Sequence, residues 1–187
     1  MTNIIAHQPS QNEAIIEINI DKLQQLFNSL DPSPFHDRDL DQDAEEYIVG
    51  WAEEIAISRP LKLLIHLPRD QLASIEQPVL ERAICNYFAY QQRQCHRRLR
   101  LLFRDGRIAF LVGVAFLFTC IFIRQLANSF GPGATSDIVA EGMLIAGWVA
   151  MWRPLQIFLY DWWPLRRRGR VFGKLSTMPA WYERARF

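Results

Sequence analysis

The sequence predicts a membrane-spanning α-helical hairpin of two spans, joined to a small cytoplasmic N-terminal α/β domain with the element order β-α-β-α. Three observations support this fold class. Two long apolar segments are separated by a short linker that contains glycine and proline. Basic residues gather at the outer ends of both apolar segments. Short stretches in which apolar and polar residues alternate, as is typical of strands, lie in the N-terminal part of the chain.

Charge is divided unevenly along the 187 residues, whose formal net charge is +1. Residues 1–90 contain 6 Lys or Arg and 15 Asp or Glu, whereas residues 91–187 contain 15 and 5. Hydrophobic residues make up 50% of the chain, and the three cysteines, Cys85, Cys95 and Cys120, have no CxxC spacing. This composition excludes a disordered chain and a small disulfide-stabilised protein. An acidic half joined to a basic half indicates two differently built parts.

The α/β domain is predicted over residues 13–76, after a polar tail at 1–12. Residues 16–20 and 61–67 each alternate between the two faces of a strand, so each stretch predicts a half-buried strand. With a helix between them, the two strands predict a βαβ unit with a right-handed crossover. Two strands are too few for an independently stable sheet, so helices, neighbours or a third strand must cover it.

Two helices are predicted between these strands. The first spans residues 22–30 with Asp21 as its cap, and the proline-containing stretch 31–34 then predicts a turn. The second begins after Asp41, which caps it, and runs to about Ile57. The helix is predicted from apolar residues that recur at helical spacing, namely Ala44, Ile48, Trp51 and Ile55.

A basic stalk helix is predicted over residues 77–107, between the acidic domain and the first span. Pro78 suits the first turn of a helix, and neither glycine nor proline follows it until Gly106. The helix is therefore expected to continue almost straight into the membrane. Its apolar stripe consists of Leu80, Ile84, Phe88, Cys95, Leu99 and Phe103.

The transmembrane helical hairpin is predicted over residues 108–160. Residues 108–123 carry no charge, and residues 138–160 form the second apolar segment. A span takes about 20 residues, with a lower limit of about 17, and arginines at both ends of the first segment extend it by snorkelling. A buried helical hairpin in a soluble protein is the alternative. Six arginines precede the first span, seven basic residues follow the second and one lies between them, which predicts that both termini are cytoplasmic.

Arg153 and Pro154 form the first candidate site. In the register that the following aromatic residues favour, the second span includes Arg153. An ionisable residue inside a span predicts contact with a substrate, an ion or a lipid headgroup. The alternative interpretation is a snorkelling arginine paired with Asp161 or Gln156. Pro154 removes a backbone donor and predicts a kink in the helix.

Small residues predict close packing between helices. Gly142, Ala146 and Ala150 recur at every fourth position of the second span, and Ala109 and Gly113 have the same spacing in the first. Such rows allow helix backbones to approach, because packing drives helix association in lipid. We therefore expect one face for the other arm of the hairpin and one for another subunit, which predicts a homo-oligomer.

The segment 161–187 is predicted to be a basic, aromatic tail on the membrane surface. The lipid-facing residues expected in it are Trp162, Trp163, Arg166, Arg167 and Arg168. This composition fits contact with the anionic lipids of the inner leaflet. Nucleic-acid binding is the competing interpretation of a basic, aromatic stretch. The position directly after a span favours lipid, so no nucleic-acid partner is expected.

No metal site, cofactor or catalytic residue is predicted. The alternate aspartates from Asp37 to Asp43 suggest an EF-hand, but Gln42 and Ile48 occupy the positions that require glycine and glutamate. The cysteines and His96 lack zinc-ligand spacing. The sequence contains no P-loop, GxGxxG, HExxH or GxSxG motif. We expect the carboxylates to stabilise a helix N-terminus and the cysteines to be reduced packing residues.

A resemblance rests on two stretches, SLDPSPFHDRDLDQDAEEYIVGWA at 29–52 and MWRPLQIFLYDWWP at 151–164. In them the chain resembles a family of small bacterial inner-membrane proteins with two spans, and the similarity extends over about residues 13–175. The resemblance implies a bacterial source, the inner membrane and the same topology. It implies no activity, cofactor or catalytic residue.

These patterns together predict a non-enzymatic inner-membrane protein. We expect it to assemble into homo-oligomers or to dock a cytoplasmic protein partner through its acidic domain. The alternative is a subunit of an oligomeric channel or transporter, with Arg153 and Pro154 near the pathway. Two spans leave little room for a solute path, so a pore requires several copies.

Overall fold

The computed structural model describes residues 13–28, 38–68, 76–129 and 134–184. The chain divides into two compact units. The sheet unit contains Met1–Gln94 and Arg167–Phe187, and the hairpin unit contains Cys95–Arg166. The polar tail predicted at 1–12 and the turn predicted at 31–34 lie outside the described residues.

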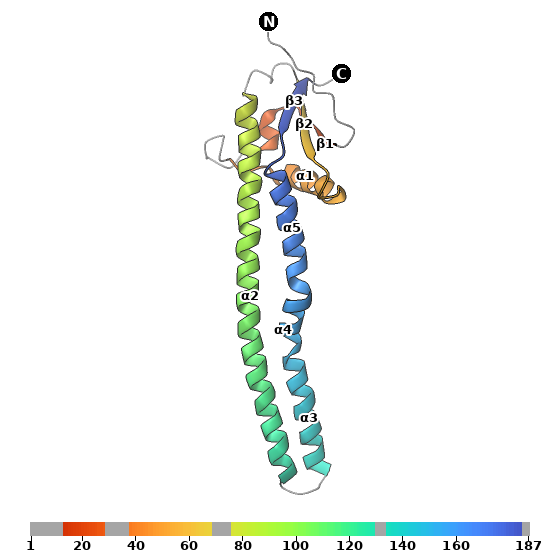
Figure 1. Ribbon diagram of the computed structural model, residues 1–187, viewed down its shortest axis with the longest axis vertical. Coiled ribbons are helices and arrows are strands. Elements are labelled where there is room, and N and C mark those ends of the chain that lie inside the picture. The colour runs from red at the N-terminus through yellow and green to blue at the C-terminus, as the bar shows by residue number, and fades with distance from the viewer. Residues whose placement is uncertain (1–12, 29–37, 69–75, 130–133, 185–187) are drawn as a thin grey trace. The chain divides into compact units, whose positions relative to one another are not determined.

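A three-stranded parallel sheet forms the centre of the sheet unit (Figure 1). Its strands are β1 (Ala14–Asn19), β2 (Leu61–Leu67) and β3 (Ala180–Arg184), in the spatial order β1-β2-β3. The middle strand buries every second residue, as its alternating sequence predicts. The first two strands lie close to their predicted positions and pair in parallel. The third strand comes from the C-terminal segment.

Strand β3 corrects the prediction for segment 161–187. Helix α5 (Trp162–Leu175) and β3 occupy most of this segment, and β3 pairs with the middle strand of the sheet. Met178 and Ala180 are buried, because these two apolar residues pack into the core although the segment 161–187 as a whole is basic. The segments 13–76 and 161–187 were predicted as separate parts. In the structure, residues from both segments belong to one folded unit.

Helix α1 (Gln42–Glu54) begins as predicted. The Asp41 carboxylate accepts a hydrogen bond from the backbone N–H of Asp43 at 3.1 Å and caps the helix. The helix ends before the predicted Ile57. Of the apolar residues that recur at helical spacing, Trp51 is 49% exposed. The buried face is instead formed by Ile48, Val49 and Ala52.

The helix predicted over residues 22–30 is reduced to one turn of 3-10 helix, η1 (Leu23–Leu26). Phe27 has extended backbone angles and forms an isolated antiparallel bridge with Leu40, which ends the turn. The N-cap residue is Lys22 and not the predicted Asp21. Leu23, Leu26 and Phe27 are all buried, so this short turn contributes to the core of the sheet unit.

Helix α2 (Gln77–Ser129) runs without interruption through the predicted stalk and first span. In the sheet unit, its stripe of Leu80, Ile84 and Phe88 is completely buried. The Phe88 ring stacks on Phe172 of α5 with 6.1 Å between centroids. The stripe thus anchors the N-terminal part of α2 in the core of the sheet unit.

The second apolar stretch is divided into four helical pieces. They are α3 (Ala134–Ala150), α4 (Trp152–Gln156), the π-helical turn η3 (Ile157–Asp161) and the first residues of α5. In the part of the chain that the structure describes, two helical stretches are long and apolar enough to cross a membrane, Gln77–Leu126 and Asp137–Leu175. The most apolar window of each is only 17% buried. Core helices of soluble proteins are mostly buried, so these two stretches depart from that pattern.

Candidate functional site: the π-helical turn of the hairpin

The second helical stretch is interrupted next to Pro154, where the sequence predicts a kink. Met151 forms a turn between α3 and α4, and the π-helical turn η3 follows α4. Pro154 has no N–H, so it cannot donate the α-helical hydrogen bond to the carbonyl oxygen of Ala150, four residues earlier. Regular helix ends at Ala150 accordingly. π-Helical turns inside helices occur frequently at functional sites.

Arg153 forms an ion pair with Asp161 in this interrupted region. The distance between Arg153 Nη1 and Asp161 Oδ2 is 3.2 Å, and the two side chains are 61% and 26% exposed. The guanidinium therefore contacts the last residue of the π-helical turn, and the basic residues from Arg166 follow later in the sequence. The structure therefore provides the counter-ion that the snorkelling interpretation of Arg153 requires.

Glycines bring the two arms of the hairpin unit close together. A Cβ atom at Gly106 of α2 would lie 2.8 Å from Ile157 Cγ2, and one at Gly113 would lie 3.2 Å from the Ala150 carbonyl oxygen. On the other arm, a Cβ atom at Gly147 would lie 2.6 Å from a methyl carbon of Leu117. Contacts this short leave no room for a side chain unless the neighbour moves, so the glycines set the distance between the arms.

The small residues predicted from spacing divide between two faces. Gly113 takes part in the close contact with the other arm, Ala150 contributes its carbonyl oxygen to that contact, and Ala146 is half-buried. Gly142 is exposed, and a Cβ atom there would meet no heavy atom of the described chain within 4 Å. The rows of small residues at every fourth position did not include Gly106 and Gly147, which also make close contacts between the arms. Their occurrence inside helical patterns was itself a signal of close packing.

Aromatic and basic side chains follow the π-helical turn directly. The indole N–H of Trp162 donates a hydrogen bond to the Phe158 carbonyl oxygen at 2.9 Å. The Arg166 guanidinium lies over the Trp162 ring at 5.7 Å from its centroid. Trp163 is exposed beside them. Exposed tryptophan next to arginine is typical of the boundary between lipid and water.

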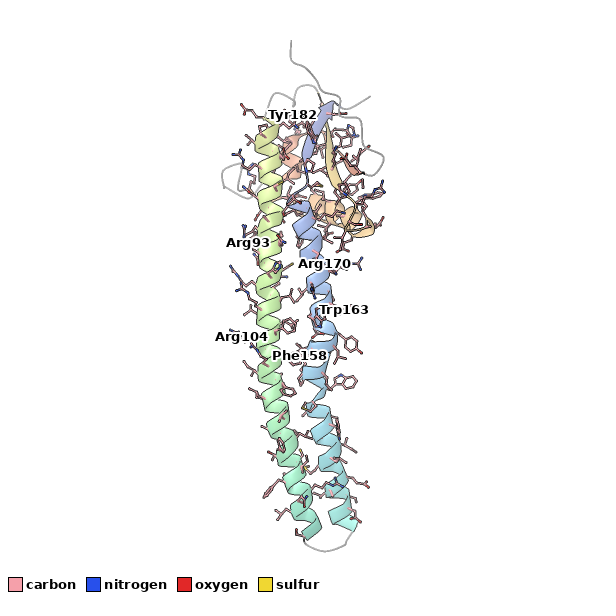
Figure 2. The ribbon with its side chains drawn as sticks, viewed as in Figure 1. Arg93, Arg104, Phe158, Trp163, Arg170 and Tyr182 are labelled. Atoms are coloured by element: carbon pink, nitrogen blue, oxygen red, sulfur yellow. The ribbon has the colours of Figure 1, made fainter. Side chains whose placement is uncertain are left out.

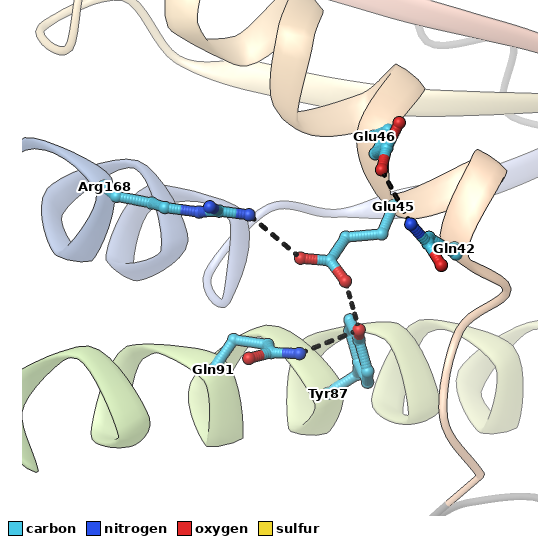
Figure 3. A network of polar contacts seen from close by, with 6 residues as sticks. All are labelled: Gln42, Glu45, Glu46, Tyr87, Gln91 and Arg168. Atoms are coloured by element: carbon cyan, nitrogen blue, oxygen red, sulfur yellow. Dashed lines mark hydrogen bonds and ion pairs between the residues drawn. The ribbon is translucent and has the colours of Figure 1, made fainter. Parts of the chain in front are cut away.

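A polar network in the sheet unit joins three helices (Figure 3). The Tyr87 hydroxyl of α2 donates to Glu45 Oε2 of α1 at 2.5 Å, and Gln91 Nε2 donates to the Tyr87 hydroxyl at 2.8 Å. Arg168 Nη2 of α5 lies 3.8 Å from Glu45 Oε1. Arg168, predicted to face lipid, thus interacts with a carboxylate, and both Arg168 and Arg167 are exposed. Sequence patterns missed this network because its members come from three separate helices.

The network predicts a pH-dependent stability of the sheet unit. Burial, and then the hydrogen bond to Glu45, raise the pKa of Tyr87 above its ordinary value of 10.0. A raised folded-state pKa stabilises the fold below pH 10, and this contribution is lost as the pH rises above 10 toward the folded-state pKa. Tyr87→Phe is expected to lower the unfolding free energy by about 1.5–3 kcal/mol at neutral pH, as for hydrogen bonds to charged groups.

Urea unfolding read by pulse proteolysis of the sheet unit measures this change at neutral pH and above pH 10. Tyr90→Phe is the matched control, because Tyr90 is exposed and accepts a hydrogen bond from Gln94 with the same i, i+4 spacing. We expect Tyr90→Phe to have little effect, and Tyr87→Phe to weaken the loss of stability at high pH. Equal effects of the two substitutions would contradict the role given to Glu45.

The cysteines show no sign of reactive chemistry or metal binding in the part of the chain that the structure describes. All three are unpaired thiols. Burial, and then the charge of Glu81, raise the pKa of the Cys85 thiol, which keeps it protonated at neutral pH. Among the described residues, no group of three His, Cys, Asp or Glu is arranged to hold a metal ion. Asp37 of the acidic run lies outside those residues.

The fold and the site define a class of protein: a mostly helical chain with two long apolar helices and a small three-stranded parallel sheet. Comparisons with protein-family models, with curated proteins and with solved structures found no match.

Proposed function

We propose that this chain is a two-span inner-membrane protein whose hairpin anchors the sheet unit and assembles with further copies. The observation that carries the proposal is the origin of the sheet. Strands β1 and β2 precede the first apolar helix and β3 follows the second, yet the three are hydrogen-bonded neighbours. Strands of one small sheet lie on the same side of a membrane, so the chain between β2 and β3 crosses it an even number of times.

Charge supports the cytoplasm as the side that holds the sheet. Six arginines lie between residues 93 and 107, directly before the first uncharged segment, and Arg124 is the one basic residue between the spans. Basic residues close to spans stay on the cytoplasmic side. Both termini are therefore cytoplasmic in this proposal, and the exposed apolar surface of α2 and α3 faces lipid or another copy.

The outer face of α3 supports assembly with another copy. Ile138, Ile145 and Val149 are each between 63% and 71% exposed. Together with Gly142 they follow one another at spacings of four, three and four residues, which places them in one seam along α3. Nothing in the described chain covers Gly142 within 4 Å, so a second helix has room to approach its backbone.

Gly142→Leu tests this assembly. The leucine fills the seam without touching the other arm, so we expect self-association to weaken by about tenfold or more, because overpacking costs about 1–3 kcal/mol. Light scattering with correction for bound detergent measures the mass of the particle. Ala115→Leu is the control, since Ala115 is exposed on α2 and gains the same volume there. A wild-type monomer at every concentration, or equal effects of both variants, would contradict the proposal.

A docking role for the sheet unit is supported by α1. Tyr47 and Trp51 are exposed on it, with their rings edge to face at 6.3 Å between centroids. Exposed glutamates at 46, 53 and 54 lie on the same helix. An aromatic pair among carboxylates fits a cytoplasmic protein whose apolar contact surface has a basic rim. The alternative of a channel or transporter subunit with Arg153 near the pathway stays a prediction.

A further inference from the structure

A groove of about 740 Å³ lies on the hairpin unit where α2 meets the π-helical turn. Four arginines of α2 line it, namely Arg97, Arg100, Arg104 and Arg107. Their spacing of three, four and three residues places them on one face of the helix. Phe103 of α2 and Phe158 of the π-helical turn complete the lining (Figure 2, where Arg104 and Phe158 are labelled). The groove therefore combines a row of cations with aromatic rings.

Close packing fixes the apolar part of this groove. Ile157 of the π-helical turn is buried, and a Cβ atom at Gly106 would lie only 2.8 Å from its Cγ2. The next residue in the turn, Phe158, has its ring 6.3 Å from that of Phe103, at an angle of 30°. Because helical residues on two arms hold these rings, the shape of the groove does not depend on a loop.

The positive charge of the groove is only partly compensated. Arg104 Nε lies 3.4 Å from Asp105 Oδ1. Arg97, Arg100 and Arg107 form no ion pair with any described residue. Guanidinium groups bind phosphate through two parallel hydrogen bonds, which makes arginine the preferred residue for such contacts. A ligand that carries more than one phosphate matches this row.

The length of the arginine row sets the size of the ligand. Between Arg97 and Arg107 the helix rises by about 15 Å, at 1.5 Å per residue. The interfacial layer of one leaflet is roughly 5–8 Å thick, and the uncharged segment begins at Ile108. Arg104 and Arg107 therefore lie at the depth of lipid phosphates, and Arg97 and Arg100 lie farther into the cytoplasm. The two guanidinium groups at that depth match a headgroup with two phosphates, each of which can accept paired hydrogen bonds from one arginine.

We propose that this groove binds an anionic phospholipid with two phosphate groups, of the diphosphatidylglycerol type. The phosphates bind to the arginine row, and the upper parts of the acyl chains lie against Phe103 and Phe158. This inference rests on the proposed two-span topology, because it needs the groove to face the inner leaflet. It assigns the groove a specific lipid ligand, in addition to the general attraction between basic residues and anionic membranes.

The test uses the full chain reconstituted in phosphatidylcholine vesicles that contain either diphosphatidylglycerol or phosphatidylglycerol. Native mass spectrometry after release into mild detergent counts the lipids that stay bound, and titration gives their affinity. Arg104→Gln combined with Arg107→Gln, the two arginines at the depth of the lipid phosphates, is expected to weaken binding of the two-phosphate lipid at least about tenfold. Arg93→Gln combined with Arg98→Gln is the matched control, because it removes the same charge from α2 outside the groove and is expected to leave binding unchanged.

Two results would overturn the lipid site. Equal losses in both double variants would mean unspecific attraction to anionic lipid. Full displacement of the lipid by inorganic pyrophosphate, with no effect of Phe158→Ala on either ligand, would mean a soluble phosphate ligand. If the glutamine variant does not fold, Arg104→Lys with Arg107→Lys keeps the charge but loses the paired hydrogen bonds, and weaker lipid binding is still expected. If the groove variant inserts and assembles normally but binds lipid like the wild type, the lipid site is refuted and the proposed topology is not. If the wild type does not insert into the vesicles, the proposed topology is refuted.

Discussion

Ala180→Asp is expected to unfold the sheet unit. Ala180 is 0% exposed and pairs with Leu63 of the middle strand, which is also completely buried. An aspartate there would be buried against apolar side chains, and an uncompensated buried charge costs about 3–5 kcal/mol. Domains are stable by only about 5–15 kcal/mol. A sheet of three strands has little stability in reserve, so we expect this one substitution to remove most of it.

Hydrogen exchange of the protein in vesicles measures this loss. Because β2 lies between β1 and β3, the backbone amides of all three strands should lose protection together in Ala180→Asp. Amides of α2 and α3 in the hairpin unit should stay protected. Glu183→Ala is the control, since Glu183 is exposed on the same strand. If β1 and β2 kept their protection while β3 alone exchanged, β3 would be an accessory strand and not part of the core.

The sheet shows how far local sequence patterns predict this fold. Strands β1 and β2 were predictable because their residues alternate between apolar and polar, which is a local property. Strand β3 has the sequence AWYER, which is short and lies in a basic segment of the chain, so it suggests a surface segment. Its pairing with β2 joins residues from opposite sides of the hairpin. Such a long-range contact produces no periodic pattern in the sequence. The sequence therefore indicated that two strands needed a further partner, but it did not indicate where a third strand lies.

The candidate site, like the sheet, was only partly predictable from the sequence. The break near Pro154 was predictable from the missing backbone N–H. The Arg153–Asp161 pair was predictable in part, because a snorkelling arginine extends toward the interface and Asp161 is the acidic residue there. The network of Glu45, Tyr87 and Arg168 was not, since it depends on how three helices pack. The groove also escaped prediction, because a π-helical turn places Phe158 beside Phe103.

Gly113→Leu is expected to force the two arms of the hairpin apart. A side chain at this position would meet the Ala150 carbonyl oxygen at 3.2 Å and Met151 Sδ at 3.1 Å. A backbone oxygen cannot rotate away, in contrast to the flexible methyl group of Leu117 that faces Gly147. Overpacking of this kind costs about 1–3 kcal/mol, which corresponds to a population of open hairpin raised by about tenfold or more.

Alkylation of Cys120 measures the opening of the arms. Cys120 is only 2% exposed, and its Cβ atom would lie 3.4 Å from a Cβ atom at Gly147, so it is covered while the arms are packed. A membrane-permeant maleimide, with peptide mass spectrometry to locate the label, should therefore modify Cys120 at least about tenfold faster in Gly113→Leu. Gly142→Leu introduces the same side chain on the open face and should leave the rate unchanged. Gly142→Leu acts on the mass of the assembly and Gly113→Leu on the hairpin, so equal labelling of Cys120 in both would show that the close contact at Gly113 does not hold the arms together.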